Sequence, residues 1–277
     1  MSALPNALAL KRADSIERLW LLGLVTPAML LIVITMVLPV GWLFYLSLLS
    51  DTGAFTTEHY VRMWEQPSYF RTFRTTFEVS IMTTAICLVI GYPLAYFLSE
   101  LPKRAANLCM IAVLLPLWTS LLVRTYAWLV LLQRKGLINN WAIELGLWTE
   151  PIALVHNMLG TLIGTVHVML PFLILPLYSS MRAIDRNYLR AAANLGASPL
   201  KTFWSIFFPL ALPGMATGAL IVFILCLGFY ITPAVLGGGK VIMVSSRIAN
   251  DIEIFFNWGA ASALGVVLLV MTALLIW

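Results

Sequence analysis

The stretch RAAANLGASPLKTFWSIFFP, residues 190–209, interrupts a chain that otherwise consists mostly of long apolar runs. Asp185, just before it, is a typical helix N-cap, because its carboxylate accepts hydrogen bonds from free backbone amides. Gly196 stands where a left-handed residue commonly ends a helix. Ser198 followed by Pro199 is typical of the start of the next helix. The stretch therefore predicts two short helices that are joined by a tight turn.

The second of these helices is expected to end at Pro209, which has no backbone amide to continue it. Its aromatic side chains, from Phe203 to Phe208, give it an apolar side, whereas three successive alanines make the first helix narrow. Small residues let a neighbouring backbone approach closely. The pair is therefore suited to being held by a partner; an interfacial helix pair with no partner is the alternative.

The rest of the chain is typical of an integral membrane protein. Of its 277 residues, 61% are hydrophobic and only 10% are charged, whereas charged residues make up about a quarter of a soluble protein. Several apolar runs exceed the roughly 20 residues that a helix needs to cross a bilayer, and in lipid each run must be helical. We predict an all-α protein with six spans, at residues 20–49, 76–99, 107–132, 152–181, 210–232 and 256–277.

The charges between the spans predict an orientation. Segments 1–19, 100–106 and 182–209 hold nine Lys or Arg against four Asp or Glu, whereas the other connecting segments hold seven of each. Because positive residues concentrate on the cytoplasmic side, we expect both termini and the loop 182–209 in the cytoplasm. The domain organisation is then a cytoplasmic segment, 1–19, and one transmembrane domain, 20–277.

Several functional classes find no support in the sequence. The three cysteines lie in apolar runs without metal-ligand spacing, so neither a disulfide nor a metal site is expected. The basic residues are scattered, so nucleic acid is not an expected partner. Motifs of intramembrane hydrolases are missing, as is the internal repeat of a stand-alone carrier. The segment GGGKV, 237–241, departs from a phosphate-binding loop at Ala234 and Val241.

The extended stretch RAAANLGASPLKTFWSIFFPLALPG, residues 190–214, resembles the cytoplasmic EAA-type loop of permease subunits of ATP-binding-cassette importers. Three further stretches are similar to the polyamine branch of that family: LPLWTSLLVRTYAWLVLL (115–132), LPFLILPLY (170–178) and TPAVLGGG (232–239). The resemblance covers nearly the whole chain. It implies the six-helix bundle of a type I importer permease, with a coupling helix in the cytoplasmic loop.

The resemblance also implies partners and a substrate. The complex would contain two ATP-binding subunits that hold ATP and magnesium, a second and homologous permease subunit, and a periplasmic solute-binding protein. It would lie in the bacterial inner membrane, surrounded by lipid, with no cofactor and no catalytic residue on this chain. The expected solute is a polyamine, putrescine or spermidine. An amino-acid derivative or another small organic solute is the alternative.

The loop would then transmit motion from the ATP-binding subunits to the spans. One position departs from the pattern, since Arg190 stands where the family usually has glutamate, and this reversal bears on how the loop pairs with its partner. The residues expected to couple are Arg190, Ala191, Ala192, Asn194, Gly196, Ala197, Ser198, Pro199, Phe203 and Pro209.

The candidate substrate path is built around a charge in the third predicted span. Arg124 lies about 7 Å from the middle of that span, counted along a straight helix, and a charge at such depth costs about 2.5–3.5 kcal/mol. Glu78, the only acidic residue inside a predicted span, is its candidate ion partner; a role of Arg124 in gating is the alternative. Aromatic faces attract alkylammonium ions, although aromatic residues in spans more often pack. The candidate path residues are Glu78, Trp118, Arg124, Tyr126, Trp128 and Tyr230.

Two pairs of glycines predict close helix contacts. Gly160 and Gly164 are four residues apart, as are Gly214 and Gly218, and small residues at this spacing let two helices approach closely. We expect contacts inside the chain; contact with another permease chain is the alternative. His167, in the fourth predicted span, is expected to be a hydrogen-bonded structural residue.

Overall fold

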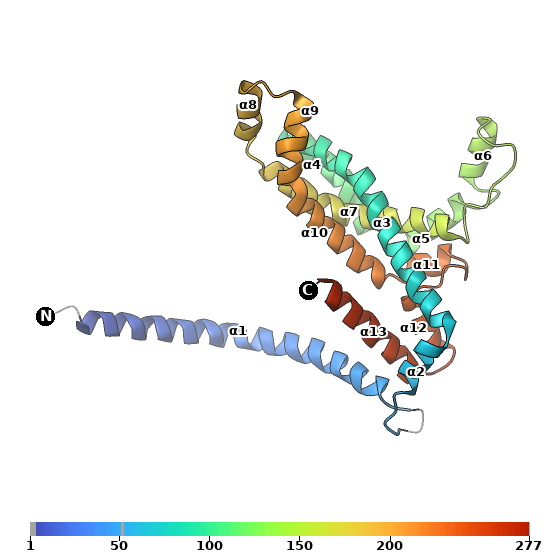
Figure 1. Cartoon of the computed structure of the whole chain (residues 1–277), viewed down its shortest axis with the longest axis horizontal. Helices are drawn as coiled ribbons and strands as arrows, with labels where there is room; N and C mark the ends of the chain where they lie inside the picture. Colours follow the sequence, from blue (N-terminus) through green and yellow to red (C-terminus); the bar gives the residue numbers. More distant parts are fainter. Residues whose placement is uncertain (1–3, 51–52, 277) are drawn as a thin grey trace.

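The computed structural model describes the backbone of residues 4–50 and 53–276, and the side chains of residues 17–50 and 53–276. Every named element in this part of the chain is helical (Figure 1). The elements are α1 (Leu4–Ser47), α2 (Glu58–Glu65), α3 (Pro67–Glu100), α4 (Lys103–Leu114), η1 (Leu115–Trp118), α5 (Leu121–Leu131), α6 (Leu137–Glu144), α7 (Met158–Ala183), α8 (Arg186–Asn194), α9 (Pro199–Thr202), η2 (Phe203–Phe207), α10 (Phe208–Leu227), α11 (Ile231–Leu236), α12 (Val244–Glu253) and α13 (Trp258–Ile276).

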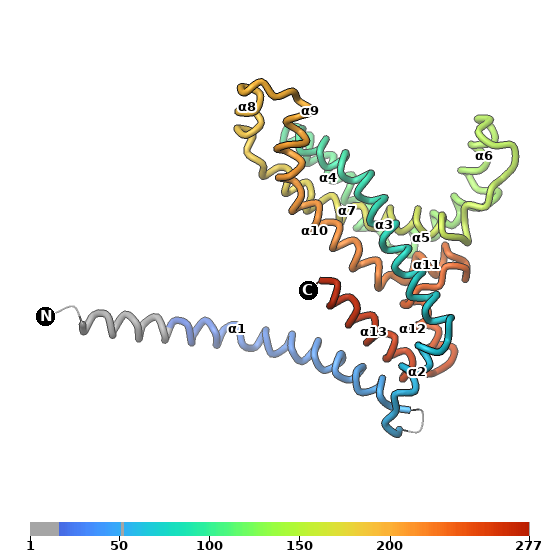
Figure 2. The backbone as a smooth tube through the Cα atoms, viewed as in Figure 1, coloured from blue at the N-terminus to red at the C-terminus, as the bar shows by residue number. Residues whose placement is uncertain are grey.

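Three long helices, α3, α7 and α10, pack against one another and form the centre of the bundle (Figure 1). The pair α8 and α9 lies at one end of this bundle, and α2 and α12 lie at the other. α1 packs on α13 and extends away from the other helices (Figure 2). The most apolar part of α1 is exposed over its whole length, as expected of a helix covered by lipid or by another chain.

Among the described residues, five helices are long and apolar enough to cross a membrane, and one bent pair brings the number to six if the pair counts as one span. The six predicted spans therefore all correspond to helical segments. The ends differ: the first helix begins before residue 20, the fourth at Met158, and the fifth ends at Leu227. The predicted connecting segments also contain the short helices α2, α6 and α12, and α11 begins at the end of the predicted fifth span.

The third predicted span, 107–132, is wrong as a single straight helix. The segment Lys103–Trp118 meets α5 at 94°. Pro116 lies in a 3₁₀ turn, and Thr119 after it is extended, with φ −91° and ψ 151°. Because proline donates no backbone hydrogen bond, the helix loosens here and restarts in a new direction at Leu121. The calculated depth of Arg124 along a straight span is therefore wrong as well.

Pro209 does not end the second helix of the loop, contrary to the expectation from its missing amide. Helix runs without a break from Pro199 to Leu227, through a π-helical segment over Phe203–Phe207. The amide of Phe208 donates to the carbonyl of Phe203, one residue further back than in an α-helix. This wider turn lies directly before the proline and lets the helix continue past a residue with no hydrogen to donate. The second helix of the loop and the fifth span therefore form one continuous helix from Pro199 to Leu227, which is called the α9–α10 rod below.

The four glycines mark close contacts within the chain, as predicted. A Cβ on Gly214 would lie 2.2 Å from the Cβ of Ser180, and one on Gly218 would lie 2.9 Å from the carbonyl oxygen of Leu173. Both contacts join α10 to α7. Gly164 meets Leu236 of α11, while Gly160 meets the chain just before α7.

At the other end of the bundle, a buried ion pair fixes α12. Asp251 lies 3.3 Å from the Nε of Arg247, whose guanidinium sits over the ring of Tyr69 at 4.8 Å. Burial raises the pKa of the Asp251 carboxyl, whereas the guanidiniums of Arg247 and Arg62 act in the opposite direction. The ion pair lies within α12, and the contact of Arg247 with Tyr69 joins this helix to the first turn of α3.

Candidate functional site

The turn between α8 and α9 has the geometry that its residues predict. Asp185 accepts a hydrogen bond from the amide of Asn187 at 2.9 Å and so caps the start of α8. Gly196 has a φ of +79°, in the left-handed region. Its amide donates to Ala193, and the next amide, that of Ala197, donates back to Ala192. These two bonds form a Schellman motif, which satisfies the last carbonyls of α8.

The second helix of the loop has a local N-terminal cap of its own. Ser198 accepts a hydrogen bond from the amide of Lys201 at 3.4 Å, and Pro199 occupies the first helical position. Both helix ends are therefore closed within a few residues. The chain reverses direction with little freedom at the turn.

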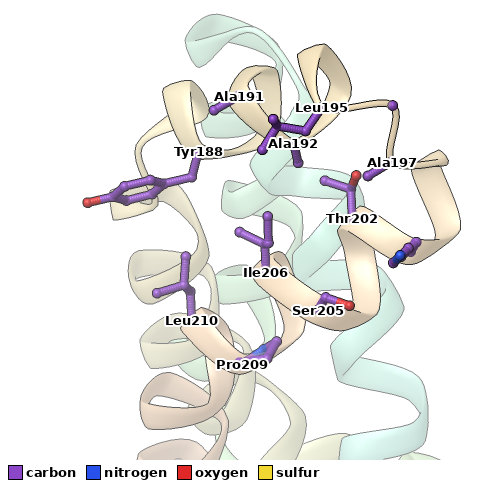
Figure 3. Close-up of a pocket in the computed structure, with 12 residues that line it drawn as sticks. Tyr188, Ala191, Ala192, Leu195, Ala197, Thr202, Ser205, Ile206, Pro209 and Leu210 are labelled. Atoms are coloured by element: carbon purple, nitrogen blue, oxygen red, sulfur yellow. The ribbon is translucent and has the colours of Figure 1, made fainter.

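A groove of about 720 Å³ opens between α8 and the rod that begins at α9 (Figure 3). Ala191 and Ala192 line one side, and their small side chains make room for it. Ile206, Pro209 and Leu210 line the other side. The complete lining is Tyr188, Ala191, Ala192, Leu195, Gly196, Ala197, Lys201, Thr202, Ser205, Ile206, Pro209 and Leu210.

Large apolar side chains border this groove and remain exposed. Leu195 is 88% exposed, and Tyr188 is also more than half exposed. Tyr188 and Leu195 were not predicted as site residues. Their spacing on α8, with Ala191 and Ala192 between them, is that of one helix face, and this pattern was the signal that could have identified them.

An aromatic cluster attaches the rod to α3. Phe207 is only 1% exposed, and its ring meets that of Tyr96 at 5.0 Å, nearly edge to face. Phe203 contacts the same tyrosine at 5.5 Å, and Phe208 contacts Tyr92 at 5.8 Å. Phe203 therefore lies behind the groove and supports the rod, although it was predicted with the coupling residues.

Two arginines attach the end of α7 and the start of α8 to the end of α3. Arg182 donates to the carbonyl oxygens of Ser99 and Leu101, at 2.9 and 3.0 Å. Arg186 donates to Ser99 as well, at 3.0 Å, and forms an ion pair with Glu100. Cations stabilise the carbonyls at a helix C-terminus. Both sides of the helix pair are thus fixed to α3, one by arginines and the other by aromatic rings.

The remaining predicted coupling residues lie on different faces. Arg190 is exposed and borders a second hollow of about 530 Å³, together with Arg182, Arg186 and Glu100. It does not line the apolar groove. Asn194 is exposed at the end of α8. The charge that departs from the family pattern therefore lies beside the groove, next to two other arginines.

The predicted pairing of Glu78 with Arg124 is wrong. Glu78 instead accepts a hydrogen bond from the Nε of Arg74, one helical turn before it on α3, at 2.7 Å. A partner on the same helix needs no particular tertiary arrangement. Arg124 follows the break in the third span and lines an apolar cavity between α5, α7 and α10.

The aromatic residues of the candidate path do not converge. Trp128 packs on α7, where its indole N–H donates to the Nδ1 of His167 at 3.1 Å; His167 is thus hydrogen-bonded, as predicted. Tyr126 is exposed and lies two residues from Trp128, hence on another face of α5. Trp118 is 83% exposed at the end of η1, and Tyr230 lies just before α11.

Comparison with known proteins agrees with this architecture. The family model described as "Binding-protein-dependent transport system inner membrane component" matches residues 22–277. A chain of the crystal structure of a bacterial alginate ABC transporter, in complex with an alginate pentasaccharide-bound periplasmic protein, superimposes with a TM-score of 0.74. That match covers 94% of both chains at 17% sequence identity, so it concerns the fold.

Curated relatives are more similar in sequence. The spermidine/putrescine transport system permease protein PotB of Haemophilus influenzae is 36% identical over 222 residues, which cover 80% of this chain and 77% of that protein. PotB of Escherichia coli is 33% identical, with 80% of each chain covered. The inner membrane ABC transporter permease protein YdcU of Escherichia coli is 30% identical over 64% of this chain and 60% of its own length.

Proposed function

Because the chain belongs to the family of inner membrane components of binding-protein-dependent transport systems, we propose that it imports a polyamine such as putrescine or spermidine. The chain is a multi-span permease subunit of an ABC importer, a transport subunit rather than an enzyme. The choice of polyamine is supported by relatives that carry this name and are 33–36% identical over 80% of the chain.

The observation that carries the mechanism is the groove between α8 and the α9–α10 rod. It presents exposed apolar side chains at one end of the bundle. Large exposed apolar patches of this kind mark interaction sites. We propose that an ATP-binding subunit, which holds ATP and magnesium, inserts into this groove from the cytoplasm. The termini of the chain would lie on the same side.

The rigid connections of the groove support its use in coupling. α9, η2 and α10 form one continuous helix, so a movement of the groove displaces the fifth span directly. The aromatic cluster and the two arginines pass the same movement to α3. Coupling requires that nucleotide binding and solute delivery favour the same state of the bundle. Because the groove is firmly attached to the spans, an ATP-binding subunit at the groove can favour the bundle conformation to which the solute is delivered.

An amino-acid derivative is the second candidate solute, and Arg124 is the observation in its favour. Its guanidinium lines a cavity within the bundle. A carboxylate would be attracted to it, whereas the ammonium groups of a polyamine would be repelled. A comparison of two amines, one with a carboxylate and one without, therefore separates the two candidate solutes.

The test is uptake into vesicles that contain this chain with its second permease chain, the ATP-binding subunit and the solute-binding protein. The panel is putrescine, spermidine, ornithine and 4-aminobutyrate. We expect uptake of putrescine or spermidine that requires both ATP and the binding protein. Uptake of ornithine or 4-aminobutyrate without either polyamine would contradict the polyamine assignment. Putrescine and ornithine differ by one carboxylate, so this pair is the matched comparison.

A further inference from the structure

Arg124 is a half-buried cation beside the cavity between α5, α7 and α10. Its Nε and Nη1 atoms are buried and have no hydrogen-bond partner in the part of the chain that the structure describes. The cavity beside it has a volume of about 360 Å³. Apart from the arginine, only apolar side chains line this cavity: Leu117, Leu121, Val168, Met169, Phe172, Leu225 and Phe229.

The chain has no acidic residue that can serve as the partner from the neighbouring helices. The sequences of η1, α5, α7, α10 and α11 contain no Asp or Glu. Glu78, the acidic residue within the apolar part of α3, is already paired with Arg74. Within the described residues, these neighbouring helices therefore offer Arg124 no carboxylate.

An unpaired guanidinium at this position is unfavourable in two ways. Buried charges in proteins are paired, because an isolated one loses its hydration without compensation. An uncompensated cation would also repel an alkylammonium solute that passes through the same bundle. A permanent carboxylate partner removes both problems.

We propose that Arg124 forms an ion pair with an Asp or Glu side chain of the second permease chain. The inference rests on the proposed function, because it needs a permease pair and a cationic solute. The surface around the site is suited to such a contact: α5 exposes Leu122, Val123 and Tyr126, and η1 exposes Trp118. An apolar surface with one unpaired cation is complementary to an apolar surface that carries one acid.

The test replaces Arg124 with methionine, which has a similar shape and no charge. The isolated chain loses a half-buried charge, so its unfolding temperature in detergent should be unchanged or higher. The complex loses an ion pair, so the second permease chain that co-purifies should fall by about tenfold or more. A loss of co-purification without a lower unfolding temperature indicates a lost interface, whereas a misfolded chain would lower both.

The control is Arg134→Gln, which removes a positive charge from an exposed position just after α5 and should change neither measurement. Arg124→Lys should restore part of the co-purification. In an Arg124→Glu background, selection for uptake should yield Asp→Lys or Glu→Lys changes in the second permease chain. Such changes would identify the partner residue.

Two results would overturn the proposal. The first is normal assembly of Arg124→Met together with an increase in the uptake of putrescine relative to ornithine, because the partner would then be a carboxylate of the solute. The second is an equal loss of stability in the isolated chain and in the complex. If the unaltered complex assembles but takes up no polyamine, the proposed substrate fails and the assembly test of Arg124 still stands.

Discussion

At the scale of single residues, Gly196 decides the shape of the candidate coupling site. No atom lies within 4 Å of a Cβ built on it, so the structure leaves space for a side chain inside this chain. The constraint is the backbone, whose φ of +79° is unfavourable for residues other than glycine. Asparagine tolerates this conformation better than β-branched residues do. A pair of substitutions at Gly196 can therefore distinguish the effect of backbone strain in the turn from the effect of added bulk on the groove surface.

We expect Gly196→Val to lower both the ATP-binding subunit that co-purifies and the rate of uptake, by about tenfold, since it strains the turn by about 1–2 kcal/mol and adds bulk to the groove. Gly196→Asn keeps the turn but also adds bulk. If a partner seats against this residue, the asparagine variant should lose co-purification too. Normal assembly and uptake in both variants would contradict docking at the groove.

At the scale of elements, the contact between α7 and α10 depends on glycines that bring two helix backbones together. The nearest atoms to a Cβ on Gly214 are the Cβ of Ser180, at 2.2 Å, and its hydroxyl oxygen, at 2.7 Å. The hydroxyl can rotate away, but the Cβ of Ser180 and the carbonyl oxygen of Pro176, at 3.1 Å, cannot move far without the α7 backbone. The close approach of these two helices also positions the rod that carries the groove.

Gly214→Ala should therefore lower the thermal stability of the isolated chain, by about 1–3 kcal/mol from overpacking. The matched control is Gly41→Ala, also within a helix but with no atom within 4 Å of the added Cβ. The control should be neutral or slightly stabilising, because alanine is the better helix former. Thermal unfolding in detergent measures both. Equal effects of the two variants would show that the contact is not tight.

At the scale of the whole molecule, the two ends of the bundle differ in a way that predicts its orientation. The end with α8 and α9 carries the groove and a cluster of arginines, whereas at the end with α2 and α12 Arg62, Arg74 and Arg247 are each paired with an acidic residue (Figure 1). We expect the α8 end in the cytoplasm, since basic residues concentrate on that side.

Single cysteines on a cysteine-free background test this orientation. Asn194→Cys places a thiol at the end of α8, and Gln66→Cys places one between α2 and α3; both positions are exposed. In right-side-out vesicles, a membrane-impermeant maleimide should label Gln66→Cys directly. Asn194→Cys should be labelled only after permeabilisation, and the reverse pattern would contradict the proposed orientation.

Much of the molecule follows from local rules in the sequence. The apolar runs predicted helices because a bilayer core leaves no other way to satisfy the backbone. Asp185, Gly196 and Ser198 predicted the caps and the turn, since each cap depends on atoms only a few residues away. The glycine pairs predicted close contacts but not their partners.

The sequence by itself determined the membrane class, the number of apolar segments and the conformation of the turn at Gly196, because each depends on composition or on neighbours along the chain. Tertiary structure decided the rest. The third span breaks after Pro116 while the helix continues past Pro209, and Trp128 of α5 meets His167 of α7. These outcomes depend on the direction in which each helix leaves a turn and on what it then meets, which spacing along the chain does not encode.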